Sequence, residues 1–255
     1  MSVLLRANQD ADAKDRLSDA ELHGQINILV FAGSDTTTSA LSRVLHLLAL
    51  HPEVQAKLRA EVVQARRDNA GEDLDYDDLA GLLYLDAITR ETLRLARADI
   101  YLPLSKPITT TSGNSVSVIP NKNDTNVIIG LAAANRDKDL WGEDADEWKP
   151  ERWINKDGSL KTAASAASED VQRLPRVYSG TMTFLGGSRA CIGFKFSQLE
   201  FKVVLSMLLE RMEFKLAEGK KIAWRNSGVT APILKSEPEG AAQLPLLIRL
   251  LEGRR

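Results

Sequence analysis

FLGGSRACIG, at residues 184–193, contains the only cysteine of this 255-residue chain. The glycines of this stretch allow the backbone to adopt positive φ angles and to approach a flat ligand closely. A strong helical pattern follows, over 192–210, and places Cys191 at the start of a helix. Unpaired amides and the positive end of the helix dipole stabilise a thiolate at such a position.

Three chemical roles are open to Cys191. A single cysteine is most often a buried, inert small hydrophobe. A nucleophilic cysteine needs a nearby base, and the histidines, His23, His46 and His51, all lie in the first helical region, where we expect His46 and His51 at helix surfaces or ends. As a ligand of haem iron, a thiolate favours O–O cleavage, and Arg189 could then bind a haem propionate through charge-assisted hydrogen bonds.

The composition excludes several classes of protein. Apolar residues make up 44% of the chain, and 33 basic and 35 acidic residues give a net charge of −2, which provides no bulk attraction to nucleic acid. One cysteine excludes an internal disulfide, and one cysteine with three scattered histidines excludes a multi-thiolate zinc site. No apolar run approaches the length of a membrane span, and the N-terminus lacks the pattern of a signal peptide.

Helical signals dominate the first hundred residues. Ser18 and Glu21 form a capping box, and the pattern stays helical until Pro52 approaches, which predicts one helix over 18–50. A helix of about thirty residues is roughly 45 Å long, which suggests that it runs through the core. Pro52 starts a second helix, and a third covers 82–95.

The pattern changes after Pro103, where alternation and β-branched residues replace the helical period. Short strands are expected at 115–118, at 126–129, and near Ile222 and Leu244. Residues 137–153 contain three tryptophans among charges and prolines and indicate an ordered irregular segment, whereas 155–180 is typical of an exposed insertion. These patterns predict a mainly α protein with a small β component.

The long helix contains a polar segment, FAGSDTTT, at residues 31–38. It is a poor helix former, because glycine costs about 1 kcal/mol relative to alanine and threonine hydroxyls can loosen the hydrogen-bond ladder. Two interpretations stay open: a groove where Ala32 and Gly33 let a ligand approach and Asp35 and Thr36 offer a proton path, or a kink that fits a neighbouring helix. The flanking apolar residues are expected to face the core: Ile26, Leu29, Val30, Leu41, Val44 and Leu45.

Two further segments are weak signals when taken alone. Glu91 and Arg94 are three residues apart on one helix, which is also the spacing of a common surface pair. Arg152 lies in the sequence PERW, at 150–153, whose proline and tryptophan could fix a turn that aims it inward. If the three met in the interior, the glutamate would bridge two guanidinium groups, and the alternative is a set of separate solvated charges.

Together these segments resemble the cytochromes P450, the haem-thiolate monooxygenases, of the fungal type. Four motifs occur in the family's order over nearly the whole chain. They are AGSDTT at 32–37, the Glu91/Arg94 pair, PERW at 150–153, and the haem-binding signature carried by Phe184, Gly187, Arg189, Cys191 and Gly193. The resemblance implies a partial cytochrome P450 domain over 1–255, the C-terminal half of that fold. It would comprise the central helix (18–50), the ExxR helix (82–95), the meander (137–153) and the haem-binding loop with the last helix (184–210).

The resemblance also implies residue roles. Cys191 would be the axial ligand of the iron of haem b, and Asp35 and Thr36 the acid–alcohol pair that supplies protons to dioxygen. Phe184 would pack near the thiolate. The cofactor-binding residues would be Cys191, Arg189, Phe184, Gly187, Gly193, Ala32 and Gly33, and the buried structural triad would be Glu91, Arg94 and Arg152.

The implied activity is insertion of one oxygen atom from O2 into a small apolar organic substrate, with electrons from an NADPH-cytochrome P450 reductase. Full-length relatives sit on the endoplasmic reticulum membrane through an N-terminal anchor, which this sequence lacks, so as it stands a cytoplasmic or unknown location is expected. The alternatives are a truncated, non-catalytic remnant, a haem-thiolate isomerase or peroxide-driven enzyme, and a thiol enzyme. The Asp35–Thr36 pair argues against the isomerase and the peroxide-driven enzyme, which often lack it.

The sequence departs from the family's pattern in two places. Family members are roughly twice as long, and the residues after Leu95 lack the usual histidine–proline–proline turn and the strand that faces the haem. The propionate-binding role of that lost stretch is therefore not transferred to Arg97. We expect the central helix to expose apolar surface, and the isolated chain to fold marginally and bind haem poorly.

Overall fold

The computed structural model describes residues 2–12, 14–95, 108–109, 113, 115–116, 130–161, 178–187, 190–227 and 229–251. The helices are α1 (Ser2–Asp10), α2 (Asp19–Leu50), α3 (Pro52–Asp68), α4 (Tyr76–Gly81), α5 (Leu83–Arg94), α6 (Leu131–Ala134), α7 (Lys138–Trp141) and α10 (Phe194–Arg211), with a 3₁₀ helix at Pro150–Trp153. The strands are β1 (Ile108–Thr109), β2 (Ser115–Val116), β3 (Met212–Leu216), β4 (Ile222–Ser227), β5 (Val229–Leu234) and β6 (Leu246–Leu250). The predicted fold class, mainly α with a small β component, is confirmed, and the described strands pair in small antiparallel sheets.

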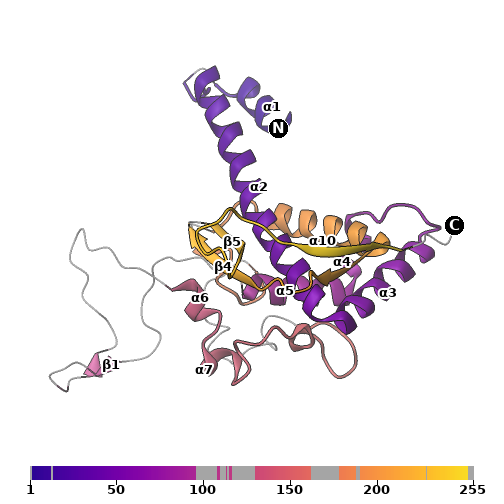
Figure 1. Cartoon of the computed structure of the whole chain (residues 1–255). Helices are drawn as coiled ribbons and strands as arrows, with labels where there is room; N and C mark the ends of the chain where they lie inside the picture. The colour runs from indigo at the N-terminus through magenta and orange to yellow at the C-terminus, as the bar shows by residue number, and fades with distance from the viewer. Residues whose placement is uncertain are drawn as a thin grey trace.

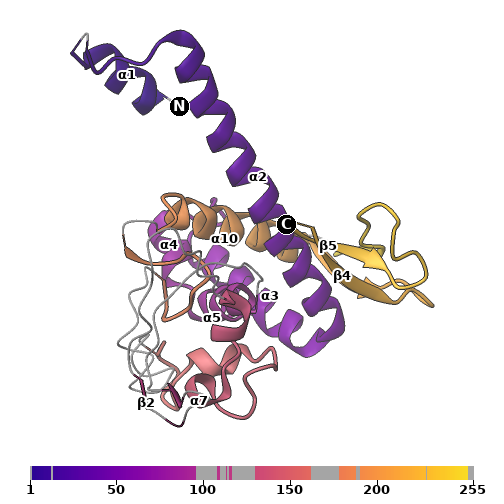
Figure 2. The same ribbon diagram turned by 90° about the vertical axis from the view of Figure 1, so that its left-hand side faces the viewer.

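The long helix α2 organises the molecule. It begins at the predicted capping box, in which the Ser18 hydroxyl accepts from the Glu21 amide and the Glu21 carboxylate accepts from the Ser18 amide. Its C-terminal half crosses the body, and its N-terminal half projects from it together with α1 (Figures 1 and 2). All of its buried residues lie between Thr37 and Ala49.

The projecting half of α2 exposes a run of apolar side chains. Ile28, Leu29, Val30 and Phe31 are between 47% and 68% exposed. The expectation that this helix exposes apolar surface is confirmed, whereas the expectation that Leu29 and Val30 face the core is wrong. An apolar pattern predicts burial only where another element packs on it, and the described elements that bury α2 cover its other half.

The core is formed where α2, α3, α5 and α10 pack together. Its fully buried side chains include Leu48, Leu58, Leu85, Ile88, Leu205 and Leu209. A buried amide connects this core to β3: Gln55 Nε2 donates to the carbonyl oxygens of Leu48 (3.0 Å) and Phe214 (2.9 Å), and its Oε1 accepts from the Phe214 amide (2.8 Å). Because its side-chain amide is hydrogen-bonded on both sides, Gln55 can be buried without an unsatisfied polar group.

The described strands form three antiparallel pairs, β1–β2, β3–β6 and β4–β5. Phe214 of β3 pairs with Ile248 of β6, and Trp224 of β4 pairs with Pro232 of β5. The strand predicted near Leu244 begins at Leu246. The strand predicted at 126–129, and 162–177 of the predicted insertion, lie outside the described residues.

The β4–β5 hairpin packs on α2 and corrects one expectation. Trp224 Nε1 donates to His46 Nδ1 over 3.2 Å, and the Arg43 guanidinium lies 4.8 Å from the centre of the same indole ring. His46 is therefore buried, whereas it was expected at a helix surface. The partner that covers it is 178 residues away in sequence, so the local pattern of the helix could not indicate it. His51, by contrast, caps the end of α2 as expected.

The last helix also differs from the expectation. It begins at Phe194 with Gly193 as its N-cap, so Cys191 lies in the turn before the cap rather than in the first helical turn. Helices α1 and α4 were not expected. Across the residues that the structure describes, no helix combines the length and apolar character needed to cross a membrane.

The burial of His46 predicts a pH dependence of stability. Burial, helped by the charge of Arg43, lowers the pKa of His46 from 6.5 to about 4. Between these values the unfolded chain binds a proton that the folded chain does not, so the free energy of unfolding falls as the pH falls from 6.5 towards 4.

Between about pH 7 and about pH 4.5, we expect the free energy of unfolding to fall by about 1–2 kcal/mol more in wild type than in His46→Gln. Glutamine keeps an acceptor for the indole but does not titrate. Urea unfolding curves at both pH values measure the difference. Equal losses in the two proteins would contradict the prediction.

Candidate functional site

The polar segment of α2 remains α-helical throughout in the structure. The Thr36 hydroxyl donates to the Ala32 carbonyl over 2.7 Å, one turn earlier. The side chains of Asp35 and Thr36 are exposed, and the adjacent Thr37 is buried with no hydrogen-bond partner for its hydroxyl among the described residues. The segment therefore presents an acid and an alcohol on an open helix surface, without a break in the α-helix.

The loop before α10 closes on itself around Cys191. The Cys191 amide donates to the Phe184 carbonyl over 2.9 Å. Gly187 has a φ of 66°, which glycine adopts without strain, and Leu185 has a φ of 60°, which is unfavourable for a residue with a Cβ. The Cys191 side chain is exposed.

Glycine leaves space beside the sulfur. A Cβ at position 193 would lie 4.0 Å from Cys191 Sγ. Any larger side chain at this position would therefore start in van der Waals contact with the sulfur. Arg189, the expected propionate-binding residue, lies outside the described residues.

An aromatic cluster supports the Cys191 loop. Phe184 is buried, and its ring packs against the edge of Tyr178 at a centroid distance of 5.6 Å and against Phe194 at 6.2 Å. Aromatic pairs in such geometries stabilise the folded protein by more than the burial of their apolar area alone would. Phe184, which was expected to pack near the thiolate, thus lies at the start of the loop. Its carbonyl accepts a hydrogen bond from the Cys191 amide.

The structure brings α2 and the segment after Cys191 together. A Cβ on Gly33 would lie 3.9 Å from the ring of Phe196, in the first turn of α10, and α10 runs beside α2 (Figure 2). Ile192 and Phe196 are 92% and 63% exposed. The glycine of the polar segment and the residues around the only thiol therefore meet where the two helices pass each other.

The second group of expected residues forms an ion cluster in which Glu91 and Arg94 are fully buried and Arg152 is nearly so. Arg94 donates through Nε to Glu91 Oε2 (2.9 Å) and through Nη2 to Glu91 Oε1 (2.8 Å), and both side chains are completely buried. Arg152 Nε donates to the same Oε1 over 3.3 Å. The remaining donors of Arg94 reach backbone carbonyls, among them those of Asn135 and Ala145 at 2.6 Å each.

Two donors of this cluster could not be assigned from the sequence. The indole Nε1 of Trp153 donates to Glu91 Oε2 over 2.9 Å, and the amide of Lys149 donates to Oε1 over 3.1 Å. A buried indole N–H usually finds an acceptor, so the position of Trp153 directly after Arg152 was the available signal. With these donors the carboxylate is saturated by hydrogen bonds, which offsets the cost of burying its charge.

Asp144 closes the cluster on the side of Arg152. Arg152 Nη1 and Lys149 Nζ donate to its two carboxylate oxygens, each over 2.8 Å. These hydrogen bonds, that of Lys149 foremost, lower the pKa of Asp144 from 3.8 to about 2. The segment of residues 144–153 is thus fixed to α5 by charge-assisted hydrogen bonds.

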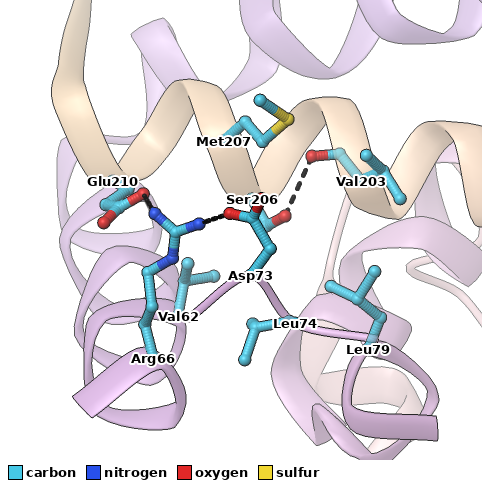
Figure 3. A pocket seen from close by; sticks show the side chains of 9 residues that line it. All are labelled: Val62, Arg66, Asp73, Leu74, Leu79, Val203, Ser206, Met207 and Glu210. Atoms are coloured by element: carbon cyan, nitrogen blue, oxygen red, sulfur yellow. Dashed lines mark hydrogen bonds and ion pairs between the residues drawn. The ribbon is translucent and has the colours of Figure 1, made fainter. Parts of the chain in front are cut away.

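A separate cavity of about 120 Å³ lies between α3, α4 and α10 (Figure 3). Arg66 extends along its wall between Glu210, 2.7 Å away, and Asp73. Ser206 and apolar residues, among them Val62 and Leu79, form the rest of its lining. It shares no lining residue with the Cys191 loop or the polar segment of α2, and its one guanidinium group is already paired with two carboxylates.

Comparisons with known proteins agree with this architecture. A family model described as Cytochrome P450 matches residues 1–239. "Cytochrome P450 monooxygenase 91" of Postia placenta is 48% identical over 97% of this chain, and "Ganoderic acid synthetase CYP5150L8" of Ganoderma lucidum is 47% identical over 93%. This chain covers 45% and 44% of their lengths, so it spans about half the length of the curated relatives it matches.

A solved structure is also similar. The crystal structure of a cytochrome P450 (CYP102L1) matches with a TM-score of 0.66 and 27% sequence identity, over 93% of this chain and 47% of that chain. The similarity therefore covers nearly all of this chain in both sequence and fold.

The cluster predicts that Trp153→Phe is more costly than Trp141→Phe. Both tryptophans are buried and both indoles donate one hydrogen bond, but Trp153 donates to a carboxylate and Trp141 to the Ala134 carbonyl. We expect Trp153→Phe to lower the free energy of unfolding by about 1 kcal/mol more than Trp141→Phe, because hydrogen bonds to charged groups contribute more. Urea unfolding of the three proteins measures this difference, and equal losses would contradict it.

Proposed function

Because the chain belongs to the cytochrome P450 family, we propose that its residues hold haem b and take part in inserting one oxygen atom from O2 into an apolar organic substrate. The observation that carries this proposal is the pairing of one exposed thiol on a glycine-rich loop with a neighbouring helix that presents an acid and an alcohol. Under this proposal electrons come from an NADPH-dependent reductase, and the whole protein acts at the endoplasmic reticulum membrane.

The chemistry of the described residues fits a haem group. A thiolate is the iron ligand that favours oxygen activation, and Cys191 is exposed, with Gly193 close to its sulfur. The exposed apolar side chains of Phe31, Ile192 and Phe196 suit a flat, largely apolar ligand. We propose Cys191 as the axial ligand, with Phe184, Gly187 and Gly193 shaping its loop, Ala32 and Gly33 facing the group, and Arg189 binding a propionate.

The bound group would supply the oxidation chemistry, and the protein would supply the ligand, the protons and the orientation. The Thr36 hydroxyl donates to the Ala32 carbonyl, which leaves its oxygen lone pairs able to accept a hydrogen bond from a ligand or water. The Asp35 carboxylate is exposed next to it, in contact with solvent. We assign proton delivery to Asp35 and orientation of the proton path to Thr36.

The Glu91, Arg94 and Arg152 cluster has a structural role in this proposal. It is buried and saturated by hydrogen bonds within the protein, so its groups are not available to a substrate. Instead it holds the segment before residue 153 against α5.

A second candidate is a non-catalytic P450 chain that retains haem poorly. The observation that favours it is the exposed apolar surface on α2, at Ile28, Leu29, Val30 and Phe31. An apolar ligand on an open surface stays partly in contact with water. It therefore buries less apolar area than it would in a closed pocket, and it binds more weakly. The two candidates differ in one measurable property, which is the haem complement of the purified chain.

Haem titration of wild type and Cys191→Ser tests the proposal. We expect the reduced, carbon-monoxide-bound wild type to show the red-shifted Soret band of thiolate ligation, and Cys191→Ser to lack it, because serine does not provide a thiolate. Absence of this band from wild type at saturating haem would favour the non-catalytic chain.

A control variant separates ligation from general damage. Ser197→Ala changes a side chain in the first turns of α10, the helix that follows the Cys191 loop. It leaves the thiol in place, and we expect it to keep the band. Persistence of the band in Cys191→Ser would exclude Cys191 as the ligand. Circular dichroism of all three proteins verifies that the helices are retained.

A further inference from the structure

We propose that Asn135 and Thr183 are positioning residues that couple the Glu91–Arg94 cluster to the loop that carries Cys191. The inference rests on the proposed function, because it assigns to these two side chains the task of placing the thiol. It is carried by hydrogen bonds that lead from the cluster to Thr183 and by the peptide bond from Thr183 to Phe184, whose carbonyl accepts from the Cys191 amide.

The first link runs from the cluster to Asn135. Arg94 Nη1 donates to the Asn135 backbone carbonyl over 2.6 Å. Asn135 is the C-cap residue of α6 and is only 1% exposed. The guanidinium that neutralises Glu91 therefore also fixes the backbone of Asn135.

The second link runs from Asn135 to the segment before the loop. Asn135 Oδ1 accepts from the Met182 amide over 2.7 Å, and Nδ2 donates to Thr183 Oγ1 over 3.1 Å. Thr183 Oγ1 in turn donates to the carbonyl of Leu93 over 2.7 Å. Because Leu93 directly precedes Arg94, the bonds form a closed circuit that starts and ends on α5.

The third link runs from Thr183 to Cys191. Thr183 precedes Phe184, whose carbonyl accepts from the Cys191 amide over 2.9 Å. Leu185 has a φ of 60°, a conformation that persists in a non-glycine residue only where the surroundings hold it. The anchors at Met182 and Thr183 lie three and two residues before Leu185, so they are placed to hold the loop in the conformation that presents the thiol.

A purely structural role makes a different prediction from a positioning role. If the Asn135–Thr183 bond only adds stability, its loss would lower protection from hydrogen exchange throughout the molecule in proportion to global stability. If it positions the loop, its loss would act first on the Cys191 amide, because local opening of the loop becomes easier.

Three variants of matched chemistry separate these roles. Thr183→Val removes the hydroxyl and keeps the shape, and Thr183→Ser keeps the hydroxyl. Thr92→Val makes the same change at a buried threonine of α5 whose hydroxyl also accepts one side-chain hydrogen bond, from Trp148 over 3.1 Å. Among the described residues, no hydrogen bond joins the Thr92 side chain to the Cys191 loop, so Thr92→Val controls for loss of a buried hydroxyl.

Hydrogen exchange of the amides in residues 178–193 is the first measurement. We expect Thr183→Val to accelerate exchange at Cys191 about fivefold beyond its effect on global stability, because the hydrogen bonds of Thr183 Oγ1 with Asn135 and with the Leu93 carbonyl are lost. Thr183→Ser should exchange like wild type, and Thr92→Val should change exchange only in proportion to global stability. Equal acceleration in Thr183→Val and Thr92→Val, or none in Thr183→Val, would overturn the proposal.

The thiolate Soret band of the haem-loaded chain is the second measurement. At equal haem content, we expect a smaller fraction of the haem to give the thiolate band in Thr183→Val than in Thr183→Ser or Thr92→Val. An equal fraction in all three variants would overturn the positioning role. If wild type never shows the band, the proposed haem function fails, while the exchange measurement still decides whether Thr183 holds the Cys191 loop.

Discussion

The carboxylate of Glu91 is the constraint on which the described structure depends. A fully buried charge is tolerated only when it is paired and hydrogen-bonded, and here two guanidinium groups, an indole and a backbone amide donate to it. These donors come from α5 and from the segment 149–153, which are far apart in sequence. The requirement to saturate one carboxylate therefore fixes where the tryptophan-rich segment lies.

The same helix connects this charge cluster to the candidate site. Arg94 reaches Asn135, Asn135 reaches Thr183, and the next residue, Phe184, closes the Cys191 loop through its carbonyl. Packing completes the support, because Phe184 lies between Tyr178 and Phe194. The Cys191 thiol is thus exposed on a loop whose base is held by polar and aromatic contacts, and the proposed role of Cys191 as a metal ligand would require such support.

Local sequence signals predicted the helices well and their surroundings poorly. The capping box at Ser18 marks the start of α2, and Pro52 marks the start of α3. Both signals act on the backbone within a few residues, so they can be recognised in the local sequence. His46 was placed wrongly, because the hairpin strand that covers it is distant in sequence. Leu29 and Val30 show the converse error, since an apolar helix face predicts burial only when another element packs on it.

The sequence by itself determined the family, the helical class and the candidate residues, since these depend on residue type and on short spacings. It identified Cys191 because the chain has no other cysteine, and Glu91 with Arg94 because three residues separate them on a helix. Their haem-related roles stay predictions. Only the tertiary structure showed that Trp153 completes the Glu91 cluster and that Asn135 joins it to the Cys191 loop. The physical reason is that a hydrogen bond between distant segments depends on how the chain packs, and neither partner carries a local sign of the other.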